Sequence, residues 1–275
     1  MFEHYFIRNT NSKLVYYFYD TGCKETLFLF HGFGQSNVVF QPYLASFASH
    51  FNIIVIDLFF HGESIVDSNT KDFISISEWN SLFQSILEKH SIQSFSCIAY
   101  SIGARFVNTL LEKQARQLKR IVFIAPDGFG NTVWFRLATS TKFTRYLFKK
   151  SMEDPSIILL ILNVFSFFNL YNRQTIRFIK RNLESLDHRQ KIYYTWTYFR
   201  NLKIKKSDFV KSITEHAILF LCICGTQDEM VAQDVLKEMC MATSSKFVII
   251  DLPHKKMLEA IQLQAVNDFL IFDRQ

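Results

Sequence analysis

The stretch FSCIAYSIGAR at residues 95–105 decides the fold. Its first half is an apolar run of strand length, its second half begins a helical pattern, and Ser101 stands at the junction. The small residues Ala99 and Gly103 lie two positions before and after this serine. Such spacing is typical of a sharp strand-to-helix turn that projects the serine oxygen, where the backbone packs too closely for larger neighbours. The alternative for Ser101 is an ordinary helix cap.

Apolar runs of strand length recur on both sides of this stretch. They lie at residues 3–8, 14–19, 26–30, 52–57, 95–99, 120–125, 217–224 and 246–252. The first two flank a polar turn and predict a hairpin. The last six are almost continuously apolar, as are strands buried on both faces of a parallel sheet. Helical patterns separate them at about 37–49, 75–90, 102–118, 229–242 and 254–272. This alternation predicts an α/β fold with a doubly wound, mostly parallel sheet of about eight strands.

One interval is much longer than a crossover between strands requires. Roughly 95 residues separate the sixth strand from the seventh, although a crossover needs only about 20 to 30. The interval contains the apolar run IILLILNVFSFFNL at 157–170, which is shorter than the roughly 18 residues of a membrane span. We therefore predict a helical cap at 127–212, inserted after the sixth strand into a core formed by 1–126 and 213–275.

The composition is that of a folded protein with a large core and an uneven charge. Of the 275 residues, 49% are hydrophobic and 20% are charged, which excludes a disordered chain. Phenylalanine is abundant, with 30 residues, whereas only 8 glycines are present. The net charge is +6, but residues 131–211 alone hold 16 Lys and Arg against 5 Asp and Glu. The basic character therefore belongs to the predicted cap.

The cysteines and the N-terminal residues bear on the compartment. The five cysteines are an odd number without the density of a disulfide-rich secreted domain, and they lack the spacing of a zinc site. We expect reduced thiols and no metal. Charged residues interrupt the first 14 residues, where a signal peptide would need an apolar core. These features favour a cytoplasmic protein.

Three further loops follow predicted strands and carry polar residues or glycine. His31-Gly32-Phe33-Gly34 comes after the strand 26–30. A glycine-bearing loop there can turn a backbone N–H toward the oxygen of an attacked carbonyl, so we expect Phe33 and Ile102 to supply the two N–H groups of an oxyanion hole. Asp228 and His254 follow two later strands, at the sheet edge where ligands meet open α/β folds. Taken singly, each is also typical of a turn.

Together these segments resemble the α/β-hydrolase superfamily in its capped form. The resemblance rests on HGFGQS at 31–36, DLFFHGES at 57–64, AYSIGAR at 99–105, GTQD at 225–228 and PH at 253–254. It implies that Ser101 is a nucleophile, that His254 is the general base and acid, and that Asp228 holds the imidazole.

The resemblance also has departures and non-catalytic positions. Phe60 and Ala99 replace glycines of the superfamily pattern, which bears on packing more than on the reaction. Asp57 matches a non-catalytic aspartate. His61 is expected in a surface turn with a structural role.

Other residues have two interpretations each. Asp127 occupies the place where some members of the superfamily keep the triad acid, and so competes with Asp228. Arg105 ends a string similar to the Y-S-x-G-G-R of a menaquinone-pathway branch, which implies contact with a substrate carboxylate; a structural ion pair is the alternative. Trp134 and Trp196 are candidates for an apolar substrate pocket, or for packing of the cap.

These observations predict a serine hydrolase that cleaves a small ester or related acyl substrate through an acyl-enzyme, without cofactor or metal. The expected substrate carries apolar or aromatic bulk. A triad-based lyase acting on an anionic substrate and a non-catalytic ligand-binding scaffold are the alternatives. No nucleic-acid module is recognisable. The basic cap could meet an anionic substrate or an acidic membrane surface, although charged helix faces are usually only solvated.

Overall fold

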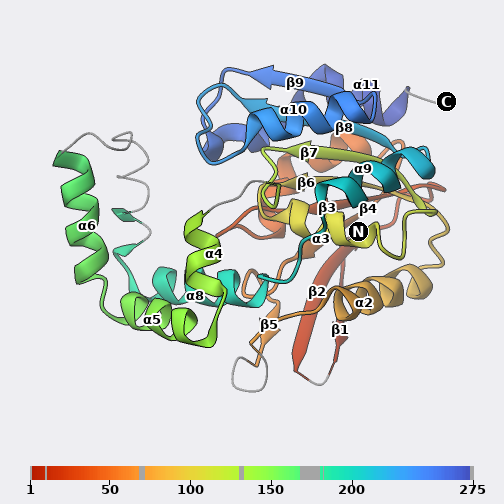
Figure 1. Ribbon diagram of the computed structural model, residues 1–275. Helices are drawn as coiled ribbons and strands as arrows, with labels where there is room; N and C mark the ends of the chain where they lie inside the picture. The colour runs from red at the N-terminus through yellow and green to blue at the C-terminus, as the bar shows by residue number, and fades with distance from the viewer. Residues whose placement is uncertain are drawn as a thin grey trace. The chain divides into compact units, whose positions relative to one another are not determined.

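One twisted sheet organises the larger part of the molecule (Figure 1). The structure is a computed structural model that describes residues 2–9, 11–67, 72–129, 133–167, 180–181 and 183–272. Within these residues the strands are β1 (Phe2–Arg8), β2 (Ser12–Tyr19), β3 (Thr26–Phe30), β4 (Asn52–Asp57), β5 (Ile65–Val66), β6 (Phe95–Tyr100), β7 (Leu118–Ile124), β8 (Leu219–Gly225) and β9 (Lys246–Ile250). Their order is β1-β2-β4-β3-β6-β7-β8-β9, and β5 pairs with β2.

Six adjacent strands of this sheet are parallel. β4, β3, β6, β7, β8 and β9 pair in parallel, whereas β1 and β2 form an antiparallel hairpin that joins β4. The predicted doubly wound, mostly parallel sheet is therefore confirmed. The short β5 was not predicted, because two residues carry no periodicity. The strand order reverses beside β3, and ligands of open α/β sheets bind outside the carboxyl ends of the strands at such a point.

Except for the helix at Lys206–Glu215, which matches none of the predicted segments, the helices around the sheet follow these segments with shorter spans. They are η1 (Asn37–Tyr43), α1 (Leu44–Phe47), α2 (Ile76–Lys89), α3 (Gly103–Leu110), α9 (Lys206–Glu215), α10 (Gln233–Ala242), η2 (His254–Gln262) and α11 (Gln264–Ile271), where η marks a 3₁₀ helix. The segments 37–49 and 254–272 each divide into a 3₁₀ and an α part, and Pro42 within η1 has no N–H to donate. The helix predicted at 102–118 ends at Leu110, because the chain must turn back to begin β7.

The two faces of the sheet bury different side chains. Leu27 and Leu29 join a cluster that includes Met257 and Phe269 of the C-terminal helices. Phe28 and Phe30 point to the opposite face, as alternation along a strand requires, and their rings contact those of Phe83 and Trp79 in α2. Phe123 of β7 and Phe220 of β8 pack there against Phe209 of α9. Much of the phenylalanine excess therefore lies on one face.

The chain divides into two compact units. The larger comprises residues 1–67, 74–130 and 202–275, and the smaller comprises 68–73 and 131–201. The boundary predicted at residue 212 differs from this division. Residues 202–212 contact the larger unit, where Leu202 and Phe209 are fully buried.

The smaller unit is helical in its described part. Its helices are α4 (Val133–Thr139), α5 (Lys142–Glu153), α6 (Ser156–Phe167) and α8 (Leu186–Tyr198). Met152, Leu162 and Leu183 form its small buried core. No described helix of either unit is long and apolar enough to cross a bilayer.

Candidate active site

Ser101 lies in a sharp turn between β6 and α3. Its φ of 49° is in the left-handed region, which costs a residue with a side chain about 1 kcal/mol or more. Backbone hydrogen bonds hold the turn, since the N–H of Ser101 donates to the carbonyl of Ile124 at 3.0 Å and its carbonyl accepts from Asp127 at 3.0 Å. This is the strand-to-helix turn that the spacing of small residues predicts.

Gly103 allows this turn to approach the end of β3. A Cβ atom on Gly103 would lie 2.7 Å from the carbonyl oxygen of Phe30 and 2.9 Å from that of His31. Both neighbours are backbone atoms, which cannot move aside as a flexible side chain can. The glycine two positions after Ser101 is therefore required by packing against the loop that follows β3.

Three side chains from three loops meet at this turn. The hydroxyl oxygen of Ser101 lies 3.0 Å from Nε2 of His254, and Nδ1 of His254 lies 2.7 Å from Oδ2 of Asp228. The side chain of Asp228 is fully buried, that of His254 is 17% exposed, and Ser101 is 9% exposed. The second oxygen of Asp228 accepts from the N–H of Met230 at 2.9 Å, which fixes the carboxylate.

Gly225, the last residue of β8, brings the loop of Asp228 beside that of His254. A Cβ atom at Gly225 would lie 2.1 Å from the carbonyl oxygen of Leu252, two residues before the histidine. The N–H of Thr226 also donates to the carbonyl of Ile250 at 2.8 Å. This close backbone contact explains why a glycine precedes the aspartate by three positions.

Tyr100 was not predicted as a site residue. Its hydroxyl donates to the backbone carbonyl of His254 at 2.7 Å, and its ring stacks on the imidazole with centroids 5.7 Å apart. Burial raises the pKa of Tyr100, so the phenol stays protonated and able to donate. The sequence held no signal for this contact, because the two residues lie 154 positions apart.

Two buried histidines, His31 and His61, hold the loop 31–34 in place. Nε2 of His31 accepts from the N–H of Leu58 at 3.0 Å, and Nδ1 donates to the carbonyl of Gly32 at 2.8 Å. The ring of Phe33 contacts that of His61, with centroids 5.6 Å apart. Within the described part of the chain, no hydrogen bond engages the backbone N–H of Phe33 or Ile102.

The sequence suggested that His61 lies in a surface turn, but it is 1% exposed and packs beneath this loop.

Asp57, in the same segment as His61, makes structural contacts. Asp57 accepts from the N–H groups of Asn37 and Glu63 at 2.7 and 3.0 Å. A Cβ atom at Gly62 would lie 1.9 Å from this carboxylate. Phe60, which replaces a glycine of the superfamily pattern, keeps a φ of 64°.

Arg105 and Asp127 form a close ion pair behind the turn. Nε and one terminal nitrogen of Arg105 donate to the two oxygens of Asp127 at 2.6 and 3.1 Å. Burial works to raise the pKa of Asp127, but the charge and hydrogen bonds of Arg105 outweigh it and the pKa is lowered. Arg105 is 4% exposed, and this bidentate pair fits the alternative interpretation, in which Arg105 belongs to a structural ion pair. Asp228, and not Asp127, contacts His254.

Of the two tryptophans predicted to line a substrate pocket, the structure describes the side chain of Trp196. The side chain of Trp134 lies outside the described ones. Trp196 contacts the rings of Phe135 and Phe148 at centroid distances of 5.4 and 5.6 Å, all within the smaller unit. These contacts fit the alternative interpretation, in which Trp196 packs helices of that unit together.

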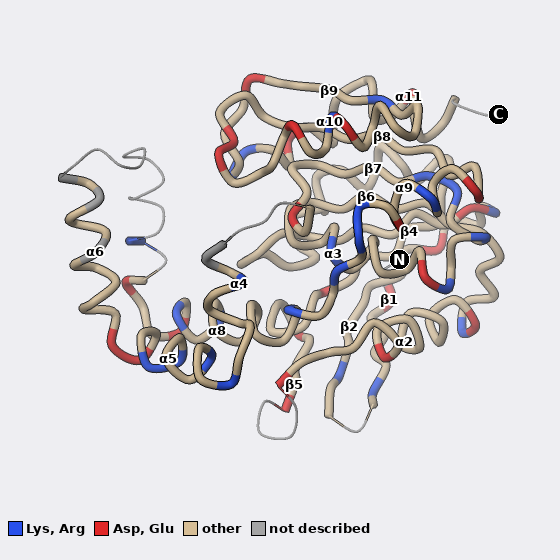
Figure 2. Tube along the Cα trace, in the orientation of Figure 1, with Lys and Arg blue, Asp and Glu red and all other residues tan. Residues whose placement is uncertain are grey.

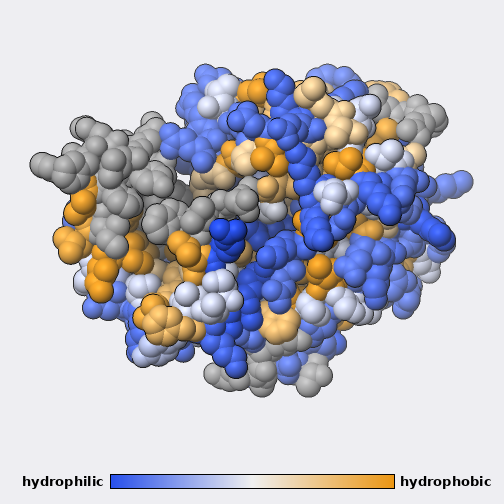
Figure 3. Space-filling view, in the orientation of Figure 1, coloured by the Kyte–Doolittle hydropathy of each residue, from blue (hydrophilic) through white to orange (hydrophobic). Residues whose placement is uncertain are grey.

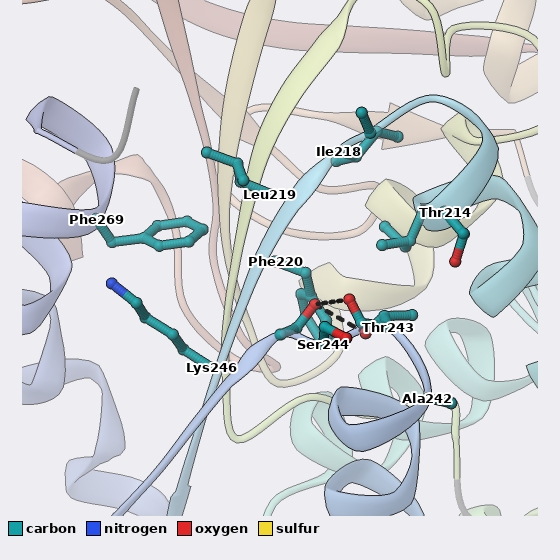
Figure 4. A pocket seen from close by; sticks show the side chains of 12 residues that line it. Thr214, Ile218, Leu219, Phe220, Ala242, Thr243, Ser244, Lys246 and Phe269 are labelled. Atoms are coloured by element: carbon teal, nitrogen blue, oxygen red, sulfur yellow. Dashed lines mark hydrogen bonds between the residues drawn. The ribbon is translucent and has the colours of Figure 1, made fainter. Parts of the chain in front are cut away.

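A cavity of about 390 Å³ lies at the other end of the strands (Figure 4). Its lining includes Leu219 and Lys246, the first residues of β8 and β9. Ser101, Asp228 and His254 follow the carboxyl ends of their strands, so this cavity is separate from them. Among the described residues, no cluster of His, Cys, Asp and Glu is arranged to hold a metal ion.

The match to a family model agrees with this fold and geometry. The model of the alpha/beta hydrolase fold matches residues 25–260, and the chain belongs to this family. It is accordingly an enzyme of the alpha/beta hydrolase class. A comparison with curated proteins found no match.

Solved structures of the same fold resemble the chain over nearly its whole length. A carboxylesterase, CesB, from Bacillus subtilis has a TM-score of 0.62 and 15% identity, covering 98% of this chain and 92% of that one. A thermophilic esterase from Thermogutta terrifontis has a TM-score of 0.66 and 16% identity, covering 98% of both chains. The enol-lactonase from Burkholderia xenovorans has a TM-score of 0.62 and 16% identity, covering 94% of this chain and 96% of that one. At these identities the likeness concerns the fold.

Proposed function

We propose that the protein is a serine hydrolase that cleaves small esters or related acyl compounds through an acyl-enzyme. The observation that carries the proposal is the chain of contacts from Ser101 through His254 to Asp228, at 3.0 and 2.7 Å. These are hydrogen-bond distances for a nucleophile with its base and for a base with its orienting acid. The burial of Asp228 and its backbone donor keep the carboxylate aimed at the imidazole.

The proposed reaction transfers an acyl group twice. The oxygen of Ser101 attacks the substrate carbonyl carbon, and Nε2 of His254 takes the hydroxyl proton. Asp228 accepts the hydrogen bond from Nδ1 and stabilises the imidazolium. The backbone N–H groups of Phe33 and Ile102 would receive the oxyanion. His254 then gives its proton to the departing alcohol. A water molecule attacks the acyl carbon while His254 takes its proton, and His254 returns that proton to the oxygen of Ser101 as the bond to the acyl group breaks and the acid leaves.

The similar structures support an acyl substrate. They include a carboxylesterase, an esterase and an enol-lactonase, whose substrates share a carbonyl bonded to oxygen. We propose that residues 131–201 act as the cap of this enzyme. Because this unit is rich in aromatic side chains, the cap would give the substrate site an apolar lining. A cytoplasmic location remains our expectation from the sequence.

The lyase alternative depends on Arg105 as the holder of a substrate carboxylate. In the structure Asp127 already occupies this guanidinium through two hydrogen bonds. A substrate carboxylate could take the place of Asp127 only after this ion pair was broken, which would leave the Asp127 charge without its partner. The observations therefore favour the hydrolase over the lyase.

Labelling with a serine-directed fluorophosphonate, followed by mass mapping, tests the proposal. We expect a single modified residue, Ser101, and no modification after Ser101→Ala or after unfolding in denaturant. A series of p-nitrophenyl esters of increasing acyl length then defines the substrate. The non-catalytic scaffold predicts neither labelling nor turnover, so an unlabelled Ser101 together with an inactive ester panel would overturn the hydrolase.

A further inference from the structure

The outward faces of α5 and α6 expose an unusual number of large apolar side chains. On α6 these are Ile157, Leu160 and Val164, which are 70%, 64% and 44% exposed. On α5 they are Phe143, Tyr146 and Leu147, which are 68%, 57% and 49% exposed. Figure 3 shows apolar side chains gathered over this part of the smaller unit. We call these six residues the α5–α6 face.

The exposed residues of α6 form one stripe along the helix. Ile157, Leu160 and Val164 are spaced by three and four positions, which places them on the same side. Leu162, on another side, is buried in the core of the smaller unit. The described residues of α6 include no charged side chain. A surface helix of a protein that meets only water normally turns polar residues outward, so this stripe indicates a partner.

Lysines lie among the apolar residues on α5. At 100° per residue, Lys142, Lys149 and Lys150 share an arc of about 160° with Phe143, Tyr146 and Leu147. All three lysines are exposed, and Figure 2 shows the basic positions along this helix. Met152 on the opposite side is buried. Glu153 lies in the same arc and pairs with Lys150 at 2.7 Å, so Lys142 and Lys149 give this exposed, otherwise apolar arc of α5 its positive charge.

The charge of the whole unit has the same sign. Residues 68–73 and 131–201 together hold 13 Lys and Arg against 5 Asp and Glu. Exposed aliphatic and aromatic side chains beside lysines are typical of helices that lie in the interface of an anionic bilayer, where the apolar groups enter the acyl boundary and the ammonium groups meet headgroup phosphates. An apolar protein partner would account for the stripe on α6, but not for the lysines that lie among the apolar residues of α5.

We propose that the α5–α6 face is a peripheral binding surface for an anionic lipid bilayer. The 12 described residues of α6 would extend about 18 Å, well short of the roughly 30 Å hydrocarbon core, so the helix would lie along the surface. None of the six residues of this face belongs to the loops of Ser101, His254 and Asp228. The proposal therefore does not depend on the reaction proposed above.

Co-sedimentation of the full-length protein with vesicles tests the proposal. We expect binding to vesicles of phosphatidylcholine containing one quarter phosphatidylserine, and little binding to pure phosphatidylcholine. Binding should weaken at about 0.5 M NaCl, which screens the lysines, without disappearing, because apolar insertion is not screened.

Two double variants separate the apolar and the cationic contributions. Ile157→Ser with Leu160→Ser should weaken binding roughly tenfold or more. Lys142→Glu with Lys149→Glu should weaken it at least about twentyfold, at about fivefold for each lysine removed. The matched controls are Met241→Ser on α10, whose side chain is 72% exposed, and Lys211→Glu on α9, whose side chain is 69% exposed. Neither control should change binding, and circular dichroism should show all variants folded.

Three outcomes would overturn the proposal. The first is an absence of binding to anionic vesicles at low salt. The second is binding that Lys211→Glu weakens as much per lysine as the double lysine variant does, and that Ile157→Ser with Leu160→Ser leaves unchanged. That result would indicate adsorption of a basic protein without a defined face. The third is a concentration-dependent dimer by light scattering that Ile157→Ser with Leu160→Ser abolishes, without vesicle binding by the wild type. That result would make the face a contact between two copies of this chain.

Discussion

The phenol of Tyr100 donates a hydrogen bond of 2.7 Å to the backbone carbonyl of His254, although the two residues lie at the ends of different strands, 154 positions apart. The stacked rings add a second contact between the same residues. Because Tyr100 directly precedes Ser101, one residue ties the loop of the proposed base to the turn of the proposed nucleophile. Tyr100 therefore acts as a positioning residue for the contact between Ser101 and His254.

Replacing Tyr100 by Phe should lower kcat about fivefold to thirtyfold and leave KM nearly unchanged. The ring and its stacking remain, but the histidine loop loses the hydrogen bond that sets its distance from Ser101. Steady-state kinetics on an accepted ester measures both constants. Tyr16→Phe is the matched control, since it removes a buried phenol's contact with Nε2 of His90 at 2.9 Å without touching the site. Equal kcat losses in the two variants would show a general effect on stability instead of positioning.

Replacing each candidate acid by Asn distinguishes Asp228 from Asp127. Asp228→Asn should reduce kcat by about 10⁴, because an amide facing Nδ1 of His254 favours the wrong imidazole tautomer. Asp127→Asn should reduce kcat less than about tenfold, since Asp127 contacts Arg105 and not the imidazole. Turnover of both proteins on the same ester, after active-site titration, gives the comparison. The reverse ranking would assign the acid to Asp127.

Replacing Gly103 by Ala should lower the free energy of unfolding by about 2–4 kcal/mol. The new Cβ atom would meet the carbonyl oxygen of Phe30 at 2.7 Å, so the turn or the end of β3 must shift. Gly34→Ala is the comparison, because it adds backbone strain without a close contact. Gly34 has a φ of 75° and no atom within 4 Å of the added Cβ, so we expect the free energy of unfolding to fall by about 1 kcal/mol. Urea unfolding of both variants measures the difference. Similar losses would argue against the packing explanation.

Breaking the pair of Arg105 and Asp127 should destabilise the protein in a pH-dependent way. In the folded state the pKa of Asp127 is below its ordinary value of 3.8, so the pair contributes stability at higher pH that is lost as pH falls through the folded pKa. Asp127→Asn should cost about 2 kcal/mol at pH 7, discounted for the 36% exposure of the carboxylate, and progressively less below about pH 4.

Chemical denaturation across this pH range measures the effect. Arg105→Met combined with Asp127→Asn should recover part of the loss, because no charge is then left buried without its partner. A cost for Asp127→Asn that stays constant from pH 7 to about pH 3 would contradict the role of the ion pair.

Thiol labelling should modify only Cys23 in the folded protein. Cys97, Cys222, Cys224 and Cys240 are buried, and burial raises the pKa of the Cys97 and Cys222 thiols, which lowers their reactive thiolate fraction. Mass spectrometry after treatment with a maleimide should find one adduct at neutral pH and five after unfolding. Cys23→Ser should abolish the native adduct. Fast labelling of Cys222 in the folded state would mean that β8 is more accessible than the structure has it.

Elements whose side chains are buried on both faces could be predicted from the sequence. The runs at 26–30 and 52–57 match β3 and β4 to the residue, because a continuous apolar stretch of this length suits a central parallel strand. Packing between distant segments leaves no such local pattern. The ring of Phe209 contacts Phe123 and Phe220 of the sheet, so α9 belongs to the larger unit, although it falls within the cap predicted at 127–212, whose bounds stay a prediction.

The sequence by itself indicated the local geometry around Ser101, since a sharp turn between a strand and a helix requires small residues such as those at 99 and 103. It also identified Asp228 and His254 as polar residues just after strands, because strand ends can be recognised from hydrophobic patterns alone. Only the tertiary structure decided which groups meet. Asp228 accepts the hydrogen bond from Nδ1 of His254, Arg105 pairs with Asp127, and the hydroxyl of Tyr100 donates to the carbonyl of His254. Such contacts depend on strand order and on close backbone packing at Gly103 and Gly225, which join parts of the chain that share no local pattern.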